Sequence, residues 1–65
     1  MPDGNKIRAL LEERDMTQAD LSRASGIEES NISYIINQSR NVREKTLAKL
    51  CRGLRCKPEE IMRED

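Results

Sequence analysis

The sequence predicts an all-α fold of five short helices, because apolar residues recur at helical spacing along most of its 65 residues. Residues that cap or end helices separate these periodic segments. The core must be aliphatic, since the chain has no Trp, no Phe and one Tyr. A chain of this length buries only roughly 60% of its unfolded surface. We therefore expect one domain over residues 1–65, with a small core spanning about residues 6–62.

The first helix is predicted over about residues 5–14, where Ile7, Leu10 and Leu11 share one face. Asp15 follows it, and Asp tolerates the left-handed backbone that ends a helix better than most residues do.

Two further helices joined at Gly26 are predicted over residues 17–37. Thr17 can cap the first of them, with Asp20 three residues later in place of the usual Glu of a capping box. Gly26 supplies the backbone freedom that a sharp turn requires. The second helix, about Glu28–Asn37, has three apolar residues on one side, namely Ile32, Ile35 and Ile36. Such a pair is a helix-turn-helix unit, whose second helix is shaped to enter the DNA major groove.

The rest of the chain predicts a polar loop and two more helices. Residues 38–43 have no helical period. A helix from Glu44 to Gly53 or Leu54 follows, with apolar residues at positions 47, 50, 51 and 54. The fifth helix is short and begins at Pro58, a residue suited to a first helical position.

Four short motifs stand in a characteristic order: Met16-Thr-Gln-Ala-Asp-Leu21, Gly26-Ile27, Asn31-Ile-Ser33 and Glu44-Lys-Thr-Leu47. In this arrangement the chain resembles the Cro/repressor (Xre-like) family of helix-turn-helix regulators, from about Lys6 to Met62. The resemblance implies a compact five-helix lambda-repressor-like domain with its helix-turn-helix formed by helices 2 and 3. It also implies a sequence-specific regulator of transcription that binds double-stranded DNA as a homodimer, weakly associated or assisted by DNA. Exposed parts of Val42, Ile61 and Met62 are candidates for the dimer surface, and the alternative is that all three belong to the core.

One departure from the family concerns the core. Many members pair an Arg at the position of Leu11 with a Glu at the position of Ile36, and both are aliphatic here. Replacing both partners of a buried ion pair by apolar residues is often neutral or stabilising. We expect Leu11 and Ile36 to be buried and in contact.

A helical wheel of the second helix of the unit places a polar stripe opposite its isoleucines. We expect the stripe to face DNA bases, and it consists of Glu29, Ser30, Ser33, Tyr34 and Asn37. Short polar side chains there can bond base edges, and Tyr34 can contact a phosphate or a thymine methyl. Periodicity alone would favour an ordinary solvated face, so this prediction depends on the helix-turn-helix context.

A net charge of zero conceals an uneven distribution. Residues 38–57 hold seven bases and one acid, a charge of +6, whereas residues 1–37 and 58–65 each carry −3. Contacts of Lys and Arg with phosphates supply most sequence-independent affinity for DNA. By resemblance, the positions expected to contact phosphates are Thr17, Gln18, Arg40, Asn41, Arg43 and Lys45.

Other function classes find little support. There is no His, no activated nucleophile and no Gly-rich phosphate loop, so we expect no enzyme, no metal and no cofactor. Cys51 and Cys56 are expected to pack as small hydrophobes. No apolar run could span a membrane or serve as a signal peptide, which indicates a cytoplasmic protein. The sequence does not suggest a small-molecule ligand.

The acidic pair Glu28 and Glu29 supports an alternative, because it would point negative charge at phosphates. The same fold could instead be a protein-interaction module, such as an antitoxin-like or anti-repressor partner.

Overall fold

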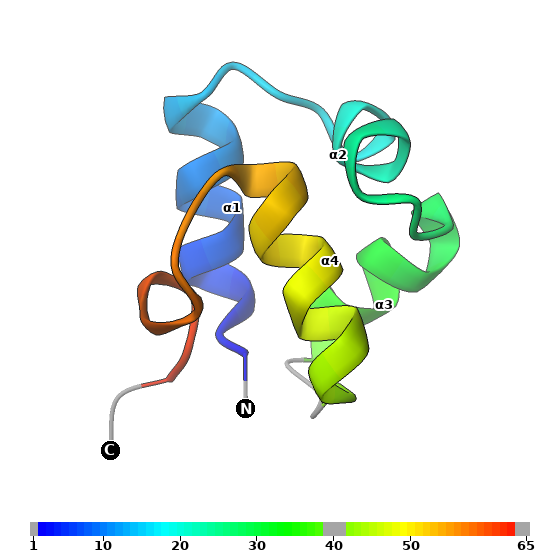
Figure 1. Ribbon diagram of the computed structural model, residues 1–65. Helices are drawn as coiled ribbons and strands as arrows, with labels where there is room; N and C mark the ends of the chain where they lie inside the picture. The colour runs from blue at the N-terminus through cyan, green and yellow to red at the C-terminus, as the bar shows by residue number, and fades with distance from the viewer. Residues whose placement is uncertain (1, 39–41, 64–65) are drawn as a thin grey trace.

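A computed structural model describes residues 2–38 and 42–63 of the chain, which form four α-helices and one short 3-10 helix (Figure 1). The elements are α1 (Gly4–Glu13), α2 (Gln18–Ser25), α3 (Glu29–Gln38), α4 (Glu44–Leu54) and η1 (Pro58–Glu60). α2 packs against both α3 and α4, and α1 packs against α3 (Figure 1).

The prediction of five helices was wrong for the last element. Residues 58–60 form a single 3-10 turn, closed by the bond from the Ile61 N–H to the Pro58 carbonyl (3.1 Å). The turn stops because the backbone after it is drawn toward the N-terminus. The Asp3 N–H donates to the Ile61 carbonyl (2.7 Å), and Lys6 Nζ donates to the Met62 carbonyl (2.9 Å).

α1 and α4 end in the same way. Each is followed by a residue that has left-handed backbone although it is not glycine. Asp15 (φ 54°) follows α1 and Arg55 (φ 57°) follows α4. In each case a later N–H reaches back five residues to close the end: the Met16 N–H donates to the Leu11 carbonyl (2.8 Å), and the Cys56 N–H to the Cys51 carbonyl (3.0 Å). The expected left-handed stop at Asp15 is confirmed.

The last turns of α2 and α4 pack closely together at Gly53. A Cβ atom at Gly53 would lie 2.8 Å from Leu21 Cδ1 and 2.9 Å from Ser25 Cβ. A glycine inside a helix costs about 1 kcal/mol relative to alanine. Here it allows the two helices to approach closer than any side chain would permit.

The core is aliphatic, as predicted, and every α-helix contributes to it. Its buried members are Ile7, Leu11, Leu21, Ile27, Ile32, Ile35, Ile36, Leu50, Cys51, Leu54 and Ile61. Leu11 is 6% exposed and Ile36 2%, so both positions of the family's ion pair lie in this apolar cluster. The same burial excludes Ile61 as an exposed dimer contact, because its side chain is 0% exposed, whereas Val42 and Met62 are half-buried.

The cysteines are free thiols at the end of α4. Cys51 belongs to the core, and Cys56, which lies beyond the helix, packs against the core. Burial raises the pKa of the Cys51 thiol and raises that of Cys56 to about 11. Both thiols are therefore protonated at neutral pH, and their low thiolate content makes them poor nucleophiles.

The buried pair of Leu11 and Ile36 gives a test of the core. We expect Ile36→Ala to lower the free energy of unfolding by about 2–4 kcal/mol through lost burial and a cavity. Ile36→Glu should cost at least as much, because the new carboxylate would be buried opposite an aliphatic side chain. Asn31→Glu, an exposed position on the same helix, is the control. Thermal unfolding of the three variants measures the effect, and an Ile36→Glu protein as stable as the control would contradict the assignment.

Candidate nucleic-acid interface

The start of α2 is fixed by a capping box between Thr17 and Asp20. The Asp20 N–H donates to Thr17 Oγ1, and the Thr17 N–H donates to Asp20 Oδ2, both at 3.0 Å. The bond from the Thr17 N–H is the main reason that the pKa of Asp20 lies below its ordinary value; the Thr17 hydroxyl and Arg23 act in the same direction. The predicted capping box is confirmed.

The turn between α2 and α3 is held by hydrogen bonds on both sides of Gly26. Gly26 adopts left-handed backbone (φ 79°), and its N–H donates to the Ser22 carbonyl (2.9 Å). The Ile27 N–H donates to Ser25 Oγ (3.2 Å), while the Ser22 hydroxyl donates to the Ile27 carbonyl. Ile27 itself is 6% exposed. These contacts fix the direction in which α3 leaves α2.

One face of α3 is buried and the other is open. Ile32, Ile35 and Ile36 are at most 3% exposed. On the other side, the predicted stripe is accessible: Glu29, Ser30, Tyr34 and Asn37 are exposed, and Ser33 is half-buried. Tyr34, 44% exposed, is the large hydrophobic residue that the described surface presents to solvent. The helix thus offers a polar strip with one aromatic ring.

Asn37 is tied to a residue that the sequence did not single out. Arg8 on α1 donates from Nη2 to Asn37 Oδ1, and Asn37 Nδ2 donates to Ser33 Oγ (3.3 Å). Arg8 Nη1 also lies 3.4 Å from Asn5 Oδ1. The contact places a cation beside the last turn of α3. Only the packing of α1 on α3 brings Arg8 there, so a local motif could not have identified it.

The positions expected to contact phosphates lie at two other helix starts. Thr17 precedes α2 and is exposed, and Gln18 is its half-buried first residue. Arg43 precedes α4 with extended backbone, and both it and Lys45 are exposed. Arg40 and Asn41 lie outside the described residues. The structure therefore leaves Arg43 and Lys45 accessible on the segment that follows α3.

The acids at the start of α3 are accessible too. Glu28 and Glu29 are both exposed, and the Glu28 carbonyl accepts the Ile32 N–H (3.0 Å). A carboxylate in the first turn of a helix is favoured by the helix dipole. The helix dipole therefore explains the two acids at this position, whether α3 contacts DNA or a protein.

Two other kinds of site find no support in residues 2–38 and 42–63. These residues contain no group of three or more potential metal ligands among Cys, Asp and Glu. None of their helices is long and apolar enough to cross a membrane.

Known DNA-binding domains share this arrangement of helices. The profile of the Cro/C1-type HTH DNA-binding domain matches residues 6–63. The fold is similar to that of the restriction-modification controller protein C.AhdI from Aeromonas hydrophila, with a TM-score of 0.83 and 27% identity over 91% of this chain and 89% of that one. It is also similar to the restriction-modification controller protein C.Esp1396I, with a TM-score of 0.75 and 33% identity over 83% of this chain and 70% of that one.

No curated protein sequence matches the chain. The matched profile nevertheless spans nearly all of it, including the capping box, the turn at Gly26 and the polar strip of α3. The chain belongs to the family of Cro/C1-type helix-turn-helix DNA-binding domains.

Proposed function

We propose that this protein regulates transcription by binding duplex DNA sequence-specifically, with α3 in the major groove. The observation that carries the proposal is the division of α3 into a buried isoleucine face and an exposed strip of Glu29, Ser30, Ser33, Tyr34 and Asn37. A helix docked in this way presents its outer side chains to base edges. The likeness to two controller proteins supports a regulatory role over a catalytic one. The proposal places this role in the cytoplasm.

Phosphate contacts in this proposal come from both flanks of α3. Gln18 and the Thr17 hydroxyl stand at the start of α2, and Arg43 and Lys45 stand at the start of α4. Arg8 adds a cation beside Asn37. Such contacts set the register of a protein on the duplex, whereas the strip on α3 reads the sequence.

We further propose that two copies bind together. One recognition helix covers only a half-site, and a twofold pair would place two of them about 34 Å apart on successive major-groove faces. Val42 and Met62, each half-buried, are the accessible apolar residues among the three candidates for the dimer surface.

The exposed pair Glu28 and Glu29 favours a second candidate, a protein-interaction module on the same fold. In that case α3 would meet a basic protein surface. Glutamate can also accept a hydrogen bond from cytosine N4, so the pair is compatible with base readout.

The two kinds of DNA contact predict different mutant behaviour. Arg43→Gln should weaken binding to all sequences alike and lower the slope of log affinity against log salt by about one unit. Tyr34→Ala or Ser30→Ala should leave the slope intact and alter preference at one base pair, by about 1–3 kcal/mol for a good contact. Binding is measured on duplexes selected from a random pool, across a salt series, with Arg52→Gln on the exposed side of α4 as control. An Arg43→Gln protein with the parent's slope would remove Arg43 from the interface.

The Glu29→Gln variant tests whether the Glu29 carboxylate contacts a base or lies in the groove without contributing to recognition. If Glu29 accepts from a cytosine, the variant should lose preference at that one position. We expect this result, and a selection repeated with the variant will reveal it. A uniform gain in affinity for every duplex would show instead that Glu29 only repels phosphates. If parent and variant both bind DNA no better than a neutral unrelated protein at low salt, α3 faces a protein.

Footprinting on a selected duplex tests the assembly. We expect protection of two half-sites about one helical turn apart, and sedimentation of the free protein should show a monomer giving way to a dimer as concentration rises. Tight stoichiometric binding of one monomer to a single half-site would contradict the paired arrangement.

A further inference from the structure

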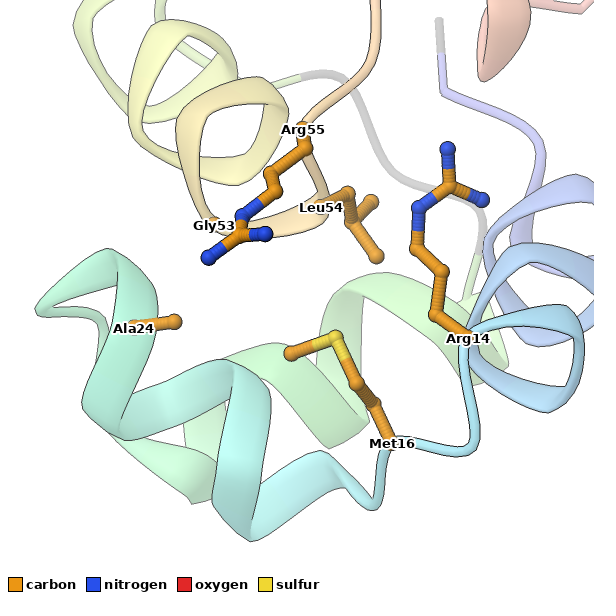
Figure 2. A pocket seen from close by; sticks show the side chains of 6 residues that line it. All are labelled: Arg14, Met16, Ala24, Gly53, Leu54 and Arg55. Carbon is orange, nitrogen blue, oxygen red and sulfur yellow. The ribbon is translucent and has the colours of Figure 1, made fainter.

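A cavity of about 570 Å³ opens where the last turns of α2 and α4 meet the end of α1 (Figure 2). Its lining consists of Arg14, Met16, Ala24, Gly53, Leu54 and Arg55. None of these residues comes from α3, so the cavity is separate from the strip proposed to read bases. Its volume lies in the range of sites that hold small organic molecules.

The wall of the cavity is mostly apolar. Figure 2 shows the side chains of Met16 and Leu54 pointing into the opening, with the methyl group of Ala24 facing them from α2. Gly53 contributes only backbone to the lining. A flat hydrocarbon group in this cavity would contact apolar side chains on several sides.

Arg14 brings an incompletely satisfied cation to this wall. Its side chain is 27% exposed, and Nη1 is buried without a hydrogen-bond acceptor in the described part of the chain. The carboxylate of Glu13 lies 3.8 Å from Nη1, beyond hydrogen-bond distance, and is itself 72% exposed. A buried donor without an acceptor is unfavourable. Because Nη1 is closed to solvent, a ligand oxygen in the cavity would reach it only when the Arg14 side chain turns toward the opening, and the hydrogen bond gained there would favour that movement.

Arg55 supplies a second cation on the opposite rim. In Figure 2 its guanidinium reaches across the opening toward Ala24. It is exposed and forms no ion pair with any carboxylate among the described residues. Arg55 also occupies a left-handed position (φ 57°), where glycine would be favoured.

We infer that this cavity binds a small organic acid, with a carboxylate held by Arg14 and Arg55 and a flat apolar body lying on Met16, Leu54 and Ala24. Guanidinium groups recognise carboxylates through paired hydrogen bonds. The apolar wall distinguishes such an acid from an inorganic anion, which would gain nothing from it. The site does not depend on the proposed function, because no residue assigned to DNA lines it.

The test uses 2-naphthoate as the acid and 2-naphthamide as its uncharged analogue, titrated into the intact protein. Amide signals of residues 14–16, 24 and 53–55 should shift in NMR spectra, with a Kd of about 1 mM or lower, as expected for a fragment of this size. The amide should bind about tenfold more weakly, because it lacks the charge that strengthens both hydrogen bonds. Arg14→Gln and Arg55→Gln should each weaken naphthoate about tenfold, whereas Arg52→Gln on the exposed side of α4 should not.

Three results would overturn the inference: no shift at these amides at millimolar naphthoate, equal affinity for the amide, or equal affinity in both arginine variants. The comparison of acid and amide on the parent protein needs no substitution, so it holds even if a variant is unstable. Duplex DNA added at low salt should leave the naphthoate shifts in place. Displacement by DNA would instead identify the two arginines as phosphate contacts.

Discussion

The contact between α2 and α4 at Gly53 is the constraint on which the rest of the structure depends. It leaves no room for a side chain against Leu21 and Ser25, so the two helices have a fixed separation. Ser25 also accepts the N–H of Ile27, which ties the same contact to the turn that leads into α3. The orientation of the polar strip is therefore set by the packing of two helices that need not touch bases at all.

Local patterns predicted the parts of the fold that neighbours in sequence determine. Thr17 and Asp20 lie three residues apart, Gly26 needs its left-handed backbone, and the isoleucines of α3 repeat at helical spacing; the structure has all of these. Features that depend on tertiary contact escaped prediction. The bond between Arg8 and Asn37 joins α1 to α3. The hydrogen bonds from Asp3 and Lys6 to the Ile61 and Met62 carbonyls hold the segment after the 3-10 turn against the N-terminus.

The basic segment is divided by the helix that it contains. α4 has 11 residues and is about 16 Å long, at 1.5 Å per residue. Arg43 precedes the start of α4 and Arg55 follows its end. The two charges therefore belong to the same basic segment but lie well apart in space. Arg43 lies on the segment that follows α3, whereas Arg55 lies on the rim of the cavity. The net charge of the basic segment is therefore less informative about where an anion binds than the position of each cation along α4.

The short bridge between Pro2 and Met62 joins segments about as far apart in sequence as the described residues allow. Closing so long a loop has an entropic cost that contacts already formed must offset. We therefore expect the bridge to form late in folding, after α1 and α4 have brought the two segments near each other. Local opening should begin there too, and the first core side chain to meet water would be Ile61, whose carbonyl accepts the Asp3 N–H. The half of the molecule that holds α2 and α3 could then stay folded while the two chain ends separate.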